Sequence, residues 1–169
     1  MNEFMVAFIE NDRSEGDVIL SGYVAAIRAQ VGHRPLILNS ASGALLNSQK
    51  QVLLQERTDT GDWGFPGGYL EYGETYEQAL TREFQEDAGV NVLPERLLTL
   101  SDDLTYQYPN GNQVQPINCF YLVRYMSGQL LGMKTDETMA LAYFALSNPP
   151  HFFNQQHVQM FEKLQSLFL

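Results

Sequence analysis

The chain has one cysteine, no long apolar run and few basic residues. The single thiol, Cys119, cannot form an internal disulfide, and its place in the apolar run 117–123 predicts a core position. No window approaches the roughly 18 uninterrupted apolar residues of a membrane span. The first ten residues, MNEFMVAFIE, lack the basic start of a signal peptide. These absences favour a cytoplasmic protein with no membrane partner.

Basic residues are outnumbered by acids, 10 against 20, which gives a formal net charge of −10. A nucleic-acid partner would need a basic footprint, so none is expected. A phosphate substrate remains compatible with this charge, because bound divalent cations can lie between acidic side chains and phosphates. The acidity therefore raises the expectation of a cation site, although most of these acids must form a solvated surface.

The pattern along the 169 residues predicts one folded unit of mixed helices and strands, without repeats or linkers. Helices before, between and after the strands indicate an α/β fold with a mixed β-sheet covered on both faces. Strands 44–46 and 51–57 are expected to form a hairpin, as are 97–108 and 113–125 around the turn 109–112. The expected helices are 17–31, 76–88 and 154–167, and the remaining strands are 36–39 and 140–146.

Local signals define the ends of the central helix, 76–88. Thr75 and Gln78 have the spacing of a capping box, and Gly89 stands where a left-handed residue ends a helix. At 100° per residue, Glu83, Glu86 and Asp87 fall within an arc of roughly 100°. Like charges this close destabilise a helix unless a cation is bound between them, so this face is a candidate metal site. The alternative is a solvated acidic face.

The segment 68–90 carries a specific motif. Gly68 is followed after five residues by Glu74, and after seven more by REFQEDAGV at 82–90. This pattern resembles the Nudix box, G-x5-E-x7-R-E-U-x-E-E-x-G-U, where U is bulky and apolar. Every fixed position matches except the last glutamate, which is Asp87 here. The resemblance implies a Nudix-type α/β/α sandwich for residues 34–169, preceded by an N-terminal helical extension, 1–33.

The resemblance also implies a metal site. In such proteins the residues that match Glu83, Glu86 and Asp87 bind Mg²⁺ or Mn²⁺, together with the carbonyl of the residue that matches Gly67. Aspartate reaches roughly 1.5 Å less than glutamate, while hard cations hold their ligands at about 2.0–2.6 Å. Asp87 is therefore expected to hold its cation through a water, or to need a small shift of the helix.

The implied reaction is attack of water on phosphorus in a diphosphate joined to a nucleoside. The arginine that matches Arg82 orients the first box glutamate, Glu83. A further acid from a later loop often joins the site as ligand or general base, and Glu137 is the first candidate, ahead of Asp136. The sequence leaves open whether Glu83, Glu86 or Glu137 is the base.

Substrate contacts are expected from Arg57, Trp63 and Tyr106, which could meet a phosphate or stack on a base. Trp63 could equally cover the core, and an aromatic residue on a strand such as Tyr106 is common for packing alone. The open substrates are nucleoside triphosphates, dinucleoside polyphosphates and nucleotide sugars such as ADP-ribose. The alternative functions are a non-catalytic nucleotide-sensing module, and a diphosphate isomerase that would need a cysteine better placed than Cys119. The N-terminal helix could pack on the domain or form a homodimer contact.

Overall fold

The computed structural model describes residues 22–169. The first described helix, α1 (Tyr23–Val31), ends at Gly32, which has a positive φ of 64°. This is the C-terminal part of the helix expected at 17–31, and residues 17–21 lie outside the described residues. No helix in the described part of the chain is long and apolar enough to cross a membrane.

The strands form two sheets. In the larger sheet the order is β4-β1-β7-β5, with β6 beside β7, and only β1 and β7 run parallel. The smaller sheet has the order β3-β2-β8 and is antiparallel. The strands of the larger sheet are β1 (Leu36–Leu45), β4 (Gly67–Tyr69), β5 (Val90–Ser101), β6 (Tyr106–Gln107) and β7 (Gln113–Gly128). Those of the smaller sheet are β2 (Gln51–Arg57), β3 (Trp63–Gly64) and β8 (Thr138–Ala145).

The prediction that segments 44–46 and 51–57 form a hairpin within one sheet is wrong. The segments 36–39 and 44–46 belong to the single strand β1, and only the bridge from Leu46 to Val52 joins it to β2. Both strands are buried over most of their length, so each is an interior strand of its own sheet: β1 lies between β4 and β7, and β2 lies between β3 and β8. The second expected hairpin is confirmed, because Tyr106 pairs with Val114 across the turn. Its first strand is divided, with β5 starting already at Val90.

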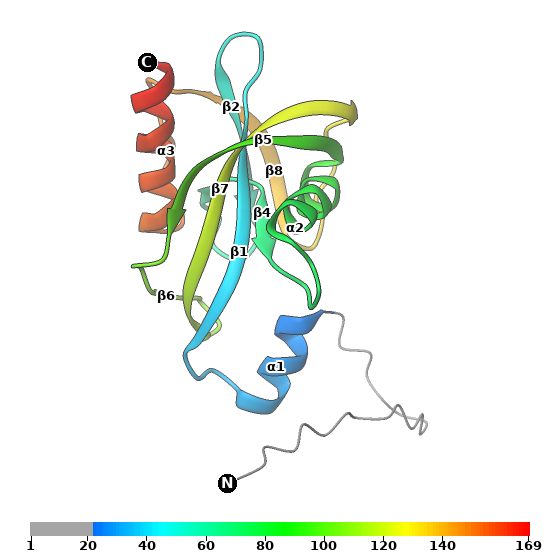
Figure 1. Ribbon diagram of the computed structural model, residues 1–169, viewed down its shortest axis with the longest axis vertical. Coiled ribbons are helices and arrows are strands. Elements are labelled where there is room, and N and C mark those ends of the chain that lie inside the picture. The colour runs from blue at the N-terminus through cyan, green and yellow to red at the C-terminus, as the bar shows by residue number, and fades with distance from the viewer. Residues whose placement is uncertain (1–21) are drawn as a thin grey trace, which may run out of the picture.

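Helices lie on opposite sides of the strands, with α2 (Tyr76–Glu83) on one side and α3 (Gln155–Phe168) on the other (Figure 1). One core cluster packs Leu80 and Phe84 of the central helical segment against Ala41 and Val123. The other packs the C-terminal helix against the opposite faces, through residues such as Phe161. These layers confirm the α/β/α sandwich with a mixed sheet, and Cys119 is buried as expected.

Candidate active site

The central helix of the motif ends in a wide turn. The capping box at Thr75 starts α2 as expected, but the helix continues as the π turn η1 (Phe84–Ala88). A π turn holds more residues than an α turn, so each residue rotates by less than 100° about the helix axis. Four residues then complete nearly a full turn. Asp87 therefore stays close to Glu83, as the fourth residue along also does in an α turn, whereas Glu86 is rotated further to the side.

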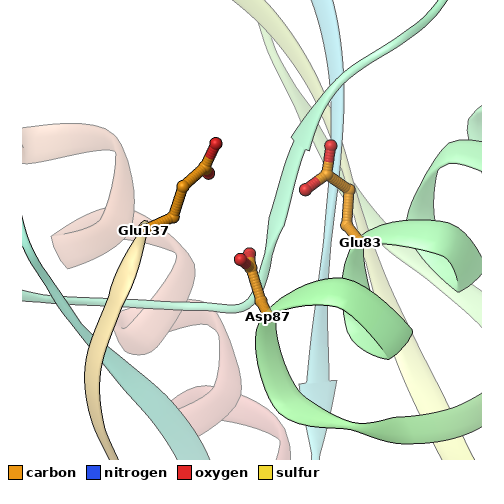
Figure 2. Close-up of side chains that lie close together, drawn as sticks. All are labelled: Glu83, Asp87 and Glu137. Atoms are coloured by element: carbon orange, nitrogen blue, oxygen red, sulfur yellow. The ribbon is translucent and has the colours of Figure 1, made fainter. Parts of the chain in front are cut away.

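Three carboxylates converge at this end of the helix (Figure 2). Glu83, Asp87 and Glu137 each offer an oxygen within 4.8 Å of the other two. The first two come from the helix, and Glu137 comes from the residue just before β8. Hard cations take oxygen ligands at roughly 2.0–2.6 Å, so ligands on opposite sides of one ion lie roughly 4–5 Å apart. The three side chains therefore fit a divalent cation such as Mg²⁺ or Mn²⁺ without a large movement.

Burial makes two of these carboxylates reluctant to ionise. Glu83 is 8% exposed and Asp87 is 4% exposed. Burial raises the pKa of Glu83 to about 7, although the Arg82 guanidinium opposes this shift. Burial also raises the pKa of Asp87 to about 7, with the charges of Glu83 and Glu137 adding to it. A cation bound among them would favour their charged forms, because its positive charge offsets both effects.

Arg82 holds the acids of the motif in place. Its guanidinium donates to both carboxylate oxygens of Glu74, at 2.8 and 2.9 Å, and to Oε1 of Glu83 at 2.8 Å. The same Nη1 donates to Oε2 of Glu86 at 2.9 Å, and Nη2 donates to the carbonyl of Tyr69 at 3.1 Å. Five hydrogen bonds in one planar fork fix the Glu83 side chain and the end of β4 together.

The two glycines before the motif loop allow β4 to approach its neighbours closely. A Cβ on Gly67 would overlap the backbone of β1 at Ala41 and Ser42, and Gly67 also has a φ of 146°. A Cβ on Gly68 would overlap the carboxylate of Glu83. The backbone of β4 therefore lies directly against the first acid of the site, and both glycines line the cleft.

The converging acids lie in a cleft of about 960 Å³ that also contains an aromatic wall. In this wall the ring of Tyr106 meets Phe153 edge to face at 5.6 Å and Tyr108 at 4.9 Å. The Arg57 guanidinium stands 4.5 Å from the centroid of Phe153 and is paired with Asp59 at 2.8 Å. Such a wall offers stacking surfaces beside an arginine whose charge is paired with a carboxylate.

Not all of the site residues expected from the sequence lie together in the cleft. Arg57 and Tyr106 line the cleft, whereas Trp63 packs against Phe144 at 4.7 Å beside the core. Glu86 lines the cleft but stands outside the converging group, with its side chain 58% exposed and held by Arg82. Asp136 is exposed and also lies outside that group.

Two cleft residues carried no signal in the sequence. Phe153 forms the centre of the aromatic wall, although it stands in an ordinary apolar pair before the last helix. His157 is buried, and its Nδ1 accepts a hydrogen bond from the backbone of Phe65 at 3.0 Å. Burial lowers the pKa of His157 to about 3, so this ring is neutral. Both were hidden because a sequence pattern does not show which loops converge.

Comparison with known proteins identifies the family of the chain. The model of the NUDIX domain family matches residues 37–164. An 8-oxo-dGTP diphosphatase of Haemophilus influenzae is 32% identical over 115 residues, which cover 65% of this chain and 79% of that protein. One of Proteus vulgaris is 38% identical over 77 residues, which cover 43% of this chain and 66% of the relative.

Solved structures show the same fold. The crystal structure of an ADP-ribose pyrophosphatase from Streptococcus suis superposes with a TM-score of 0.60 at 20% identity, covering 78% of this chain and 92% of that one. The chain belongs to the Nudix family. It is a hydrolase of the kind that acts on acid anhydrides in phosphorus-containing compounds.

Proposed function

We propose that the protein hydrolyses the phosphoanhydride bond of a nucleoside diphosphate linked to another group, and that it requires Mg²⁺ or Mn²⁺. The observation that carries this proposal is the convergence of Glu83, Asp87 and Glu137 in a large cleft. A divalent cation bound there would neutralise the phosphate oxygens and position the attacking water. Side chains of the protein would accept the proton of this water and bind the nucleoside.

Burial divides the roles of the three acids. Glu83 and Asp87 are buried on the helix, and Arg82 fixes the Glu83 carboxylate, so these two suit the stable binding of a cation. Glu137 comes from a separate segment and is exposed to the cleft, where water has access. We propose that this carboxylate is the general base, which accepts a proton from the water that attacks phosphorus.

The aromatic wall supplies a place for the nucleoside. Tyr106 and Phe153 present ring surface on which a base can stack, and the Arg57 guanidinium, paired with Asp59, lies beside them. The relatives are named for 8-oxo-dGTP and the structural neighbour for ADP-ribose, and both compounds carry a diphosphate on a nucleoside. These names support the shared diphosphate as the part of the substrate that the site recognises.

The proposal is tested by product release from a panel of nucleoside triphosphates, dinucleoside polyphosphates and nucleoside diphosphate sugars. Hydrolysis should need Mg²⁺ or Mn²⁺ and stop in excess EDTA. Glu137→Gln should lower kcat by about 100-fold and weaken Mn²⁺ binding, followed by paramagnetic resonance, much less than Asp87→Asn does. Asp136→Asn is the matched control and should be unchanged in both. A Glu137→Gln variant that loses Mn²⁺ binding would make Glu137 a ligand, and undiminished hydrolysis in EDTA would refute the proposal.

A further inference from the structure

The helix α1 precedes the residues that the family model matches, and it lies near the start of β1, beside the loop that leads into α2 (Figure 1). Val24, Ala25 and Arg28 line the cleft from this helix. These positions fall on one face, since they lie within roughly 100° of one another about the helix axis. The cleft of this protein is therefore longer than the matched domain alone would make it.

Both ends of α1 are held by polar contacts. At its start, the backbone N–H of Tyr23 donates to Oε2 of Glu71, in the loop of the motif, at 2.7 Å. Near its end, the Arg28 guanidinium donates to the carbonyls of Gly32, Arg34 and Gln113, at 3.0, 2.6 and 2.7 Å. Contacts across 48 and 85 residues of sequence fix the position of the helix relative to β4 and β7.

The helix α1 is not held in place by packing into the hydrophobic core. Among the described residues, neither of the two core clusters contains a member of α1, and no residue of the helix is buried. The exposed polar contacts that dock it contribute little to stability on their own. What the fixed position of α1 does provide is a wall for the cleft.

The compartment beside α1 differs in chemistry from the rest of the cleft. The cleft-lining residues that lie near α1 in the chain or on the strands beside it include Val24 and Ala25, Leu38 of β1, Val114 of β7, and Asn110 and Asn112 of the turn before β7. The two charged groups of this compartment, Arg28 and Glu71, have opposite signs. The Arg28 guanidinium already donates to three carbonyls, and the Glu71 carboxylate already accepts from the first N–H of α1. An uncharged group that carries hydroxyls suits this surface better than another phosphate does.

Tyr69 connects this compartment to the acids. Its carbonyl accepts a hydrogen bond from Arg82, and its phenol contacts the Tyr108 hydroxyl at 2.9 Å, beside the aromatic wall. A substrate with its diphosphate at the acids and its base on that wall would direct its second end past Tyr69 toward α1. We infer that α1 is a specificity element that receives an uncharged sugar joined to the far phosphate. The preferred substrates are then nucleoside diphosphate sugars rather than nucleoside triphosphates, an inference that rests on the proposed function.

The test narrows the compartment with Ala25→Phe and, independently, with Val24→Phe. The matched control is Ala29→Phe, because Ala29 is exposed on the same helix and does not line the cleft. Each protein is assayed with Mg²⁺ on ADP-ribose and on ATP, which share one base. Wild type should prefer ADP-ribose. Both cleft variants should lose about tenfold or more in kcat/KM for ADP-ribose, mainly through KM, and stay within about twofold on ATP.

A second readout is inhibition by ribose 5-phosphate, whose inhibition constant should rise in Ala25→Phe and not in Ala29→Phe. Equal losses on both substrates would place the nucleoside beside α1 and overturn the inference, as would a control variant that behaves like the cleft variants. An unchanged preference in both cleft variants would overturn it too. Each of these results leaves the proposed function standing, whereas a wild type that hydrolyses no nucleotide of the wider panel would overturn both.

Discussion

Replacing Asp87 by asparagine should stabilise the metal-free protein above neutral pH. Asp87 is 4% exposed, and burial together with the charges of Glu83 and Glu137 raises its pKa from 3.8 to about 7. The folded state therefore holds its proton at pH values where the unfolded state has lost it. Stability conferred by that proton is full below about pH 4, falls as the pH rises toward 7, and stays low above.

The size of this effect follows from the pKa. A pKa raised from 3.8 to about 7 lowers the free energy of unfolding by about 4 kcal/mol at about pH 8. Asparagine still places a polar amide at the buried position, so Asp87→Asn should recover only part of this free energy, about 2 kcal/mol. For a chain of this size, that gain is a rise in Tm of roughly 4–8 °C.

The assay is thermal unfolding in EDTA at about pH 5 and about pH 8, with Asp136→Asn as an exposed control. Asp87→Asn should exceed wild type at the higher pH and match it more closely at the lower one. Millimolar Mg²⁺ at about pH 8 should raise the Tm of wild type and raise that of Asp87→Asn much less, because one ligand is missing. Equal Tm values for the two proteins in EDTA at about pH 8 would refute the reasoning.

Three further changes test other parts of the site. Glu83→Gln should fold normally yet lose about 100-fold or more in kcat, measured by steady-state hydrolysis; a purified variant with full turnover would remove Glu83 from the site. Arg82→Lys cannot reproduce the planar fork to three carboxylates, so kcat should fall at least about tenfold and Mn²⁺ binding should weaken in a metal titration, whereas unchanged values would make the fork dispensable. Tyr106→Ala should raise KM for a nucleotide more than for inorganic pyrophosphate, and equal effects with a lowered Tm would assign the ring to packing alone.

Local chemistry made part of the fold predictable. Thr75 and Gln78 bond reciprocally as a capping box, and Gly89 adopts the left-handed conformation with a φ of 76°. Asn154 caps the last helix by accepting from the backbone of His157. Each of these features involves residues at one end of a helix that lie close together in the sequence. A short stretch of sequence is therefore enough to predict them.

Contacts between distant segments were not predictable in the same way. The separation of β1 and β2 into different sheets depends on their partners β7 and β8, more than 60 residues further along the chain. The aromatic wall likewise needs Arg57, Tyr106 and Phe153 to meet, and each stands in an unremarkable local pattern. The acids Glu83 and Asp87 could be named from their spacing, but their burial could not. Sequence therefore predicted the chemistry of the site better than its shape.

The π turn and the aspartate at position 87 explain each other, and this leads to a last prediction. In an ordinary α turn Asp87 would still share a face with Glu83, about 40° away from it about the helix axis. The wide turn instead widens the helix at Asp87 and rotates Glu86 away. In the wide turn, Asp87 already has an oxygen within 4.8 Å of both Glu83 and Glu137. Its backbone is held there, because the Thr138 hydroxyl donates to the Asp87 carbonyl at 3.0 Å and accepts from Gln55 at 2.8 Å.

Restoring the glutamate of the family pattern should therefore not improve this site. Asp87→Glu adds a methylene at a position that is 4% exposed, which costs about 1–3 kcal/mol of overpacking unless the turn changes. Mg²⁺ accepts little distortion, so we expect Asp87→Glu to bind it more weakly than wild type and to lose less affinity for the larger Mn²⁺. Calorimetric titration of both ions into wild type and variant measures this directly. Tighter Mg²⁺ binding by Asp87→Glu would show that the wide turn does not compensate for the shorter side chain.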